Sequence, residues 1–231
     1  MTVHTPVRQR RKEARPQELL DAALDLFVEK GFAATRTEEV ALSAGVSKGT
    51  LYLYYPSKEE LLKEVIRHNM VQQITEVTGV VDDFKGSSSE LLTLLYDRWW
   101  ERIGETRASG IMKLMLSEVR NFPEIAQFYA DEVIHPFEHL LSRILQRGID
   151  TGEFRPISVP DVVHALIAPM LFLVMHKHSI GACGVGHRIE PKAFIAAQID
   201  LVLHGLEMPR AAAPARPTEG PTDRSEGQTR S

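Results

Sequence analysis

Apolar residues recur at spacings of three and four along almost the whole chain, a spacing typical of helices with one buried face. No segment shows the strict alternation of apolar and polar residues that indicates a half-buried strand. The pattern and its breaks at Gly and Pro predict helices at about 16–30, 36–44, 47–54, 58–80, 89–107, 110–120, 124–150, 159–178 and 191–206. We therefore expect an all-α fold of about nine helices.

Proline and polar residues mark several ends and bends of these helices. Pro16 suits the first turn of the first helix, because the N–H that it lacks would have no partner there. Thr35 stands three residues before Glu38, the spacing of a capping box, and so predicts the start of the second helix. Pro136 predicts a kink or a break in the seventh helix, and Pro169 predicts a bend in the eighth.

The composition is that of an ordinary globular protein. The 231 residues are 43% hydrophobic and 25% charged, which excludes wholesale disorder and fits one small module joined to a larger one. Cys183 is the only cysteine, so a disulfide-stapled secreted scaffold is excluded. The longest nearly apolar run, 162–175, contains His164 and Pro169 and is too short to span a bilayer. Since the first 16 residues have no apolar core, we expect no secretory signal, no membrane partner and a cytoplasmic location.

Charge and composition also divide the chain into regions. The net charge is −4, yet residues 1–15 carry five basic side chains against Glu13 alone. We interpret 1–15 as a basic flexible arm, which is either a solvated leader or pairs with phosphates. Residues 209–231 contain no large apolar side chain, so we expect a disordered tail there. Between the arm and the tail we expect two domains, 16–57 and 58–208.

A helix-turn-helix is the strongest motif in the sequence. Helices 36–44 and 47–54 are too short to be stable alone, Gly45 permits a tight turn between them, and Ser47 is expected to cap the second. With Val40 and Leu51 pointing inward, the polar residues that open the second of these helices project outward. Free N–H groups at a helix start suit phosphate oxygens, and Lys and Thr side chains suit phosphates or base edges. The alternative is a small helical hairpin whose tyrosines merely pack.

The residues in and around this motif resemble a known family. The resemblance is carried by the apolar stripe of 19–27, Gly31-Phe32, Thr35, Val40-Ala41, Ala44-Gly45-Val46-Ser47-Lys48-Gly49-Thr50-Leu51-Tyr52, Tyr54-Tyr55 and Ser57-Lys58-Glu59-Glu60-Leu61. Over about residues 16–62 the chain is similar to the DNA-binding domain of TetR-family transcriptional regulators. The resemblance implies an all-α homodimer with an N-terminal three-helix helix-turn-helix domain and a larger helical domain for ligand binding and dimerisation. Leu53 and Tyr55 depart from the family pattern, which often has a polar or aromatic residue and usually a Phe at these two places.

The resemblance also implies a set of DNA contacts. Arg36 and Lys58 stand at the starts of their helices and are expected to contact phosphates, while the outward residues of helix 47–54 are expected to enter the groove. Thr35 is expected to cap its helix. Several acidic residues are expected to face away from DNA: Glu18, Asp21, Asp25, Glu38 and Glu39. The implied DNA-binding residues are Arg36, Ser47, Lys48, Gly49, Thr50, Tyr52, Tyr54 and Lys58.

We interpret the protein as a nucleoid-associated, ligand-responsive repressor. It would bind a palindromic double-stranded DNA operator as a homodimer and be released by a small, apolar or aromatic effector. Helix 58–80 joins the two domains and is the expected lever. Two alternatives stay open: a DNA-binding regulator without a small-molecule ligand, and an enzyme on a helical bundle.

The C-terminal domain names no ligand. The stretches 118–124 and 152–155 resemble one common C-terminal subclass of the family, that of AefR-like regulators. Large, soft side chains predict an apolar cavity with a few histidines to orient the effector, and ordinary core packing is the alternative for each of them. The candidates are Trp99, Trp100, Met112, Met115, Leu116, Phe128, Phe137, His135, Met170 and His176, with Phe122, Met175 and His139 as further members.

Other chemistry is not indicated. His135 and His139 have the four-residue spacing of metal ligands, but no third ligand stands beside them. Cys183 lies in a Gly-rich loop without a basic helix context and is expected to be inert. The glycines of 181–186 follow no predicted strand, so they do not form a dinucleotide-binding motif. We therefore predict no catalytic residue, no metal and no cofactor.

The last two helices predict the dimer interface. Helices 159–178 and 191–206 carry more apolar residues than one buried stripe requires. A helix that is apolar on two faces needs a second partner. Two such helices from each of two chains would form a four-helix interface with twofold symmetry.

Overall fold

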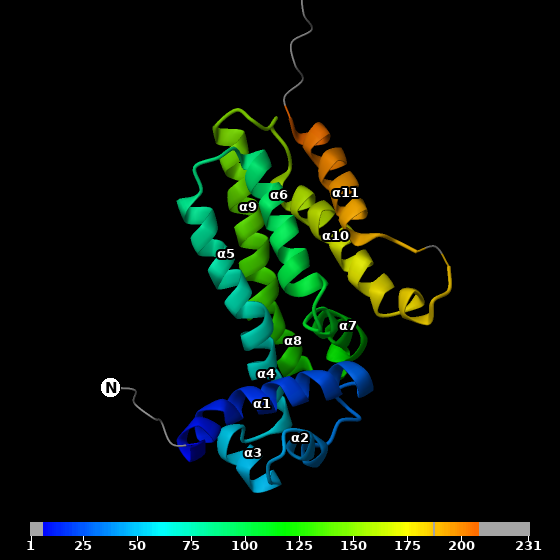
Figure 1. Ribbon diagram of the computed structural model, residues 1–231. Coiled ribbons are helices and arrows are strands. Elements are labelled where there is room, and N and C mark those ends of the chain that lie inside the picture. The colour runs from blue at the N-terminus through cyan, green and yellow to red at the C-terminus, as the bar shows by residue number, and fades with distance from the viewer. Residues whose placement is uncertain (1–6, 187, 208–231) are drawn as a thin grey trace, which may run out of the picture.

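The computed structural model describes residues 7–186 and 188–207, and in that part of the chain the fold is all-α (Figure 1). The helices are α1 (Val7–Lys30), α2 (Thr37–Ser43), α3 (Lys48–Tyr54), α4 (Lys58–Ile66), α5 (Gln72–Asp83), α6 (Ser88–Trp99), α7 (Ser109–Glu118), α8 (Pro123–Tyr129), α9 (His135–Asp150), α10 (Val159–Lys177) and α11 (Pro191–Leu206). Short 3-10 turns follow α7 at η3 (Val119–Asn121) and α10 at η5 (Ile180–Cys183).

Three π-helical turns connect or lengthen these helices. They are η1 (Arg67–Val71), η2 (Trp100–Gly104) and η4 (Ala130–Ile134). The first runs α4 into α5, the second extends α6, and the third joins α8 to α9. When each such pair is taken as one continuous helix, the nine predicted helices are confirmed in the described residues.

The helices form a small N-terminal group and a longer bundle (Figure 1). Helix α1 lies across the lower end of the bundle, with α2 and α3 beneath it. The continuous α4–α5 helix rises from α1 and runs beside α9, which also contacts α6 and α10. Helices α10 and α11 contact each other on the outer side of the bundle, and α7 contacts both α1 and α10.

One apolar core passes through both groups of helices. Leu19 and Ala23 of α1 and Leu61 and Val65 of α4 are fully buried, and they belong to the same cluster as the bundle core around Leu145. Burial of apolar side chains across this boundary couples the small group of helices to the bundle. The division into domains 16–57 and 58–208 stays a prediction, because no gap in packing separates the two.

The expected start of the first helix is wrong. Helix α1 begins at Val7, nine residues before Pro16, so most of the predicted flexible arm is helical. Its Gln, Arg, Lys, Glu and Ala residues are all good helix formers, which explains the longer helix. Pro16 consequently lies inside α1 and not in its first turn. The first six residues of the arm and the predicted tail 209–231 lie outside the described residues.

The predicted cap at Thr35 is also wrong. The Thr35 hydroxyl donates to the carbonyl oxygens of Leu26 (3.1 Å) and Gly31 (2.7 Å), so it closes the loop after α1. Arg36 occupies the cap position of α2 instead, and its backbone N–H donates to Glu39 Oε2 at 3.2 Å. The cap lies one residue later than predicted, because the Thr35 hydroxyl is hydrogen-bonded to the end of α1 and the loop that follows it.

The two internal prolines are accommodated without ending a helix. Pro136 is the second residue of α9, directly after the π turn η4, and the chain stays helical from Pro123 to Asp150. The wider turn takes the place of the predicted break, since π turns and prolines both interrupt the regular hydrogen-bond ladder. Pro169 lies inside α10, which continues to Lys177.

The sequence-based exclusion of a membrane-spanning stretch was too strict. The helical stretch Val159–Cys183, with a mean hydropathy of 1.7, is long and apolar enough to cross a membrane by length and composition alone. Helix α10 within it packs against α7, α9 and α11. Only 28% of the most apolar window is buried inside a single chain, less than is usual for the core helix of a soluble protein.

Candidate functional site

Helices α2 and α3 form the predicted helix-turn-helix. Gly45 turns the chain with a φ of +66°, and the N–H of Val46 donates to Ala41 O at 2.9 Å. Val40, Ala41 and Leu51 are buried, and α2 packs against both α3 and α1. These side chains supply the packing that helices of seven residues need in order to persist.

The start of α3 is shaped and exposed. Ser47 Oγ accepts the N–H of Thr50 at 3.1 Å and lies 2.9 Å from the Thr50 hydroxyl, so it caps the helix as expected. Lys48 and Gly49 are exposed beside this cap. The large apolar side chain of Leu53 is 85% exposed, so it has little contact with the rest of the chain. An exposed hydrocarbon side chain on this helix has the chemistry for contact with a thymine methyl group.

Lys48 is not free in this structure, and Glu38 does not face away from α3. The Lys48 ammonium forms an ion pair with the Glu38 carboxylate across the two helices. The hydrogen bond from Lys48 holds the pKa of Glu38 below its usual value, and the same contact raises the pKa of Lys48. Both side chains are about half exposed, so the pair contributes little to stability and DNA can compete for Lys48.

Tyr52 is 40% exposed, and its hydroxyl is hydrogen-bonded to the hydroxyl of Thr37 at 3.0 Å.

The other expected DNA contacts fall into three situations. Arg36 is exposed at the start of α2, where a phosphate contact is open to it. Tyr54 is half-buried and packs against the core, so it projects outward less than expected. Lys58 Nζ donates to the carbonyl oxygens of Phe32 (2.7 Å), Ala33 (3.3 Å) and Thr35 (3.0 Å). Because the three donors of the ammonium are used inside the protein, Lys58 holds the loop after α1 and is a poor phosphate clamp.

Tyr55, the second departure from the family pattern, has a use for its hydroxyl. The side chain is buried, and the hydroxyl donates to the carbonyl oxygen of Pro16 at 3.3 Å. Burial raises the pKa of Tyr55 to about 12. The added hydroxyl therefore ties α3 to α1 and does not interrupt the packing.

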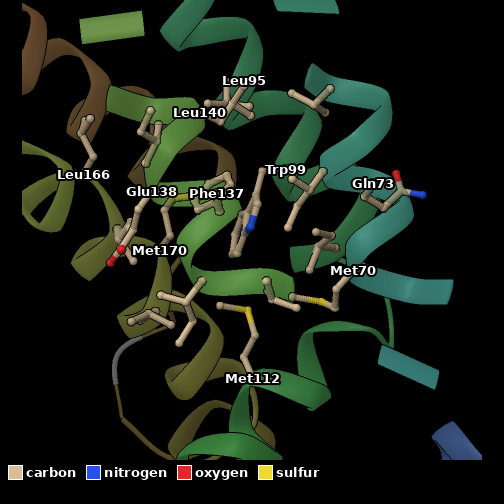
Figure 2. Close-up of a pocket in the computed structure, with 18 of the residues that line it drawn as sticks. Met70, Gln73, Leu95, Trp99, Met112, Phe137, Glu138, Leu140, Leu166 and Met170 are labelled. Carbon is tan, nitrogen blue, oxygen red and sulfur yellow. The ribbon is translucent and has the colours of Figure 1, made fainter. Parts of the chain in front are cut away.

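A cavity of about 650 Å³ lies inside the bundle. Figure 2 shows Trp99 in the middle of its wall, with Met70 and Gln73 on one side, Glu138, Leu166 and Met170 on the other, and Met112 below. Six predicted residues line it: Trp99, Met112, Met115, Leu116, Phe137 and Met170. Side chains from α4–α5, α6, α7, α9 and α10 therefore enclose a mainly apolar space, the usual character of a small-molecule site.

The remaining candidates do not line the cavity. Phe128 packs instead under the Arg67 guanidinium, with Cζ 4.7 Å from the ring centroid. His135 is exposed, with Nδ1 3.6 Å from an Asp131 carboxylate oxygen, and His176 lies 6.3 Å from the Phe172 ring, which is not part of the lining either. Helical spacing alone did not separate the two sides of these helices. Trp100, Phe122, Met175 and His139 are likewise absent from the lining.

The polar and irregular parts of this site were not predicted from the sequence. Each π turn supplies lining residues: Met70 from η1, Arg102 and Ile103 from η2, and Val133 and Ile134 from η4. An extra residue in a helical turn is invisible to a search for regular spacing, and π turns occur frequently at functional sites. The missed polar lining residues are Gln73, Arg98, Arg102, Glu138 and His164.

Helix α7 connects the cavity to the small N-terminal group. Met112 and Met115 line the cavity, and Glu118 at the end of the same helix accepts the backbone N–H groups of Phe32 (3.1 Å) and Ala33 (2.9 Å). Gly31 has a φ of +88°, and a Cβ there would clash with the Glu118 carboxylate. The cavity wall and the loop that follows α1 are thus held through one helix.

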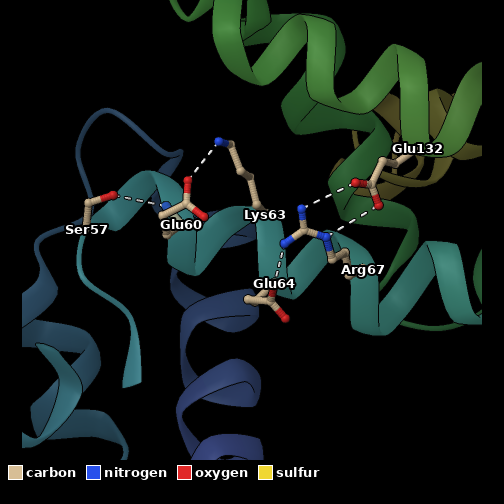
Figure 3. A network of polar contacts seen from close by, with 6 residues as sticks. All are labelled: Ser57, Glu60, Lys63, Glu64, Arg67 and Glu132. Carbon is tan, nitrogen blue, oxygen red and sulfur yellow. Dashed lines mark hydrogen bonds and ion pairs between the residues drawn. The ribbon is translucent and has the colours of Figure 1, made fainter. Parts of the chain in front are cut away.

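A second connection runs through the π turn η1. Arg67 donates to both carboxylate oxygens of Glu132 in η4, at 3.3 and 3.4 Å, and also pairs with Glu64 (Figure 3). Glu132 raises the pKa of Arg67 further, with a smaller contribution from Glu64. Two of the π turns that border the cavity are therefore fixed to each other.

No group of three or more His, Cys, Asp or Glu side chains able to hold a metal ion occurs within residues 7–186 and 188–207. His135, the first of the two histidines with metal-ligand spacing, faces Asp131 on its own helix. Cys183 is an exposed free thiol in η5.

Comparison with known proteins identifies the family. The family model for bacterial regulatory proteins of the tetR family matches residues 19–65, and that for the tetracyclin repressor-like C-terminal domain matches residues 85–181. The HTH-type transcriptional repressor KstR2 of Mycolicibacterium smegmatis is 30% identical over 155 residues, which cover 67% of this chain and 74% of the repressor. This chain belongs to the TetR family. The helix-turn-helix at α2–α3 is therefore that of a TetR-family transcriptional regulator, and the enzyme alternative is excluded.

Solved structures agree on the fold of this TetR-family regulator. FadR from Bacillus subtilis in complex with stearoyl-CoA matches with a TM-score of 0.68 at 21% identity, covering 82% of this chain and 98% of FadR. A putative regulator from Saccharomonospora viridis in complex with choline matches with a TM-score of 0.71 at 19% identity, covering 86% of this chain and 100% of the other. The resemblance of the C-terminal domain to AefR-like regulators stays a prediction.

Proposed function

We propose that this TetR-family regulator is a homodimeric repressor that binds a palindromic operator and leaves it when an apolar effector enters the cavity. The apolar cavity is the observation that carries the proposal, because its wall helix α7 also holds the loop after α1. A repressor of this kind acts in the cytoplasm, in association with the nucleoid.

The exposed residues of α3 support the DNA-reading part of the proposal. In our assignment Lys48 and Thr50 contact phosphates or base edges, and Leu53 contacts a thymine methyl group. Arg36 contacts a phosphate from the start of α2. Lys58 is left out, since its ammonium is used by three carbonyl oxygens of the chain.

The outer faces of α10 and α11 support the homodimer. Phe172 is 52% exposed and Leu201 is 70% exposed, and the small residues Ala165 and Ala197 are exposed on the same two helices. These four residues are named here the outer apolar face. A second copy would cover this face with its own and place the two α3 helices about 34–36 Å apart, one turn of DNA.

The lining of the cavity supports an effector with a large hydrocarbon part. Apart from Gln73, the two arginines, Glu138 and His164, the lining consists of aliphatic and aromatic side chains with methionines. FadR holds stearoyl-CoA, and a fatty acid metabolism regulator of Bacillus subtilis is 27% identical to this chain over 146 residues. A ligand of this kind fits the lining better than choline does, because two arginines border the cavity. In the alternative, a regulator without a ligand, the side chains that line this large apolar space would have no contact partners on that side.

Helix α7 supplies the coupling in this proposal, in addition to the expected lever α4. An effector that fills the space beside Met112 and Met115 displaces α7, and Glu118 then loses its hold on the backbone of Phe32 and Ala33. A coupling free energy of roughly 1–3 kcal/mol lowers operator affinity about 5- to 150-fold.

Selection of binding sites from a random DNA pool tests the operator part. The purified protein should enrich a palindrome with half-sites one helical turn apart. The Lys48→Ala variant is the control, because Lys48 is exposed and its loss leaves the fold intact. Enrichment of the same palindrome with unchanged affinity by this variant would show that α3 does not read the DNA, and enrichment of a single half-site would contradict the dimer.

A further inference from the structure

Two arginines border the cavity on one helix. Arg98 in α6 and Arg102 in η2 are four residues apart, and both line the cavity although both are exposed to solvent. Like charges at this spacing repel each other on a helix. The cavity is therefore apolar inside and carries two neighbouring positive charges where its wall meets water.

Neither arginine is neutralised by the protein. Within the part of the chain that the structure describes, no hydrogen bond or ion pair involves the guanidinium of Arg98 or Arg102. Other arginines of the bundle behave differently: Arg67 pairs with Glu64 and Glu132, and Arg143 pairs with Asp82.

The acidic residue of the cavity lining does not pair with Arg98 or Arg102 either. Glu138 is the acidic residue among the lining residues, and its carboxylate lies 3.7 Å from His164 Nε2, on α10. Glu138 itself is on α9, on the side of the cavity next to Met170 (Figure 2). The two positive charges are thus left without a counter-charge in the lining.

We infer that the effector is an amphipathic anion, with its hydrocarbon part in the cavity and its anionic head on Arg98 and Arg102. This inference rests on the proposed function, in which the cavity holds the effector. A guanidinium binds a carboxylate or a phosphate through two parallel hydrogen bonds, so both head groups suit the pair. The exposure of both arginines matters as well, because an anion held at the edge of the cavity keeps part of its hydration and avoids the cost of full burial.

Three probes with the same ten-carbon chain test the inference: decanoate, decyl phosphate and decanol, each below the concentration at which it forms micelles. Binding is followed by the fluorescence of Trp99, which lines the cavity, and by the shift in unfolding temperature. We expect at least one anion to bind about tenfold more tightly than decanol, equivalent to one charge-assisted hydrogen-bonded contact. The tighter of the two anions identifies the head group as a carboxylate or a phosphate.

The test variant carries both Arg98→Gln and Arg102→Gln, and the control variant carries Arg188→Gln alone. Arg188 is exposed and lies outside the cavity lining, so its variant changes the net charge only. The double variant should lose the advantage of the anion and bind decanol as the unaltered protein does, while Arg188→Gln should change neither. Since Arg98 and Arg102 are exposed and unpartnered, the double variant is expected to fold normally.

The outcomes that contradict the inference differ from those that contradict the proposed function. If decanol binds and neither anion binds more tightly, or if the double variant keeps the full preference, the head-group inference is wrong and the apolar cavity stands. If none of the three probes binds, the effector cavity of the proposed function is wrong, and the inference falls with it.

Discussion

At the scale of single residues, two side chains of α3 already have partners within the protein. DNA that binds α3 would either replace these contacts or leave them intact. Lys48 pairs with Glu38, and Tyr52 bonds Thr37. The first contact is electrostatic and exposed, so a phosphate can replace it at little cost. The second joins two neutral hydroxyls and orients Tyr52 before DNA arrives.

Glu38→Gln should strengthen operator binding. The change removes a negative charge next to Lys48, which we propose to contact DNA, and frees its ammonium for a phosphate. We expect an affinity increase of about threefold to tenfold at low salt, shrinking as salt is added. Fluorescence anisotropy with a labelled operator measures the effect. The control is Glu39→Gln, whose carboxylate pairs with Lys30 on α1; equal changes in the two variants would contradict a specific role for Glu38.

Gly31→Ala and Gly45→Ala should destabilise the fold to different extents. Both glycines have positive φ, at +88° and +66°, so an added side chain strains each by about 1–2 kcal/mol. Only at Gly31 does the new Cβ also meet Glu118, while nothing lies within 4 Å at Gly45. Urea unfolding should therefore show a further loss of about 1–3 kcal/mol for Gly31→Ala, from the two hydrogen bonds that Glu118 makes. Equal losses would mean that Glu118 moves aside freely.

At the scale of elements, the π turns and α7 give the bundle its functional shape. The turns η1, η2 and η4 all face the cavity, and Arg67 ties η1 to η4 through Glu132. Helix α7 carries cavity residues in its middle and Glu118 at its end. Under the proposed function, a displacement of α7 acts on the loop after α1, which Lys58 of α4 holds from its other side.

Glu118→Ala should loosen the loop after α1. The substitution removes both acceptors of the Phe32 and Ala33 amides, and a hydrogen bond to a charged group contributes about 1.5–3 kcal/mol. We expect these amides to exchange with solvent deuterium about 10- to 100-fold faster, measured by mass spectrometry on peptides covering the loop. Glu124→Ala, an exposed acid at the start of α8, should leave the exchange unchanged. Unchanged exchange in Glu118→Ala would remove α7 from the coupling.

At the scale of the whole molecule, the palindromic operator of the proposed function requires two copies of the chain. The outer apolar face on α10 and α11 is the surface proposed for this pairing. Leu201→Glu should place a charge in the centre of the contact and leave the fold intact, since the side chain is 70% exposed in a single chain. We expect a monomer in analytical ultracentrifugation at micromolar concentration and at least a tenfold weaker affinity for a two-half-site operator.

Val185→Glu is the matched control for this prediction. Val185 is also an exposed apolar residue, but it lies in the loop after η5 and outside the outer apolar face. The control should remain a dimer. A dimer that persists in Leu201→Glu would place the contact elsewhere on the molecule.

Local patterns in the sequence suffice for the helices and the DNA-binding motif. These features depend on residues close together in the chain, so the sequence alone predicts them. The signals are the spacing of apolar residues, the turn at Gly45 and the cap at Ser47. The family resemblance extended this to the exposed residues of α3. The start of α1 was missed because Pro16 is a typical first-turn residue, while the helix formers before it compete successfully.

Contacts between distant segments needed the tertiary structure. Lys58 has the position of a phosphate ligand in the sequence, but the loop 32–35 folds its carbonyl oxygens around the ammonium. Arg98 and Arg102 look like ordinary surface arginines until α7, α9 and α10 close a cavity beside them. Spacing along one helix tells which residues share a face, but which face lines a cavity depends on how the other helices pack. The helix-turn-helix could therefore be predicted from residue order, whereas the cavity and its link to α1 arise only from packing between helices.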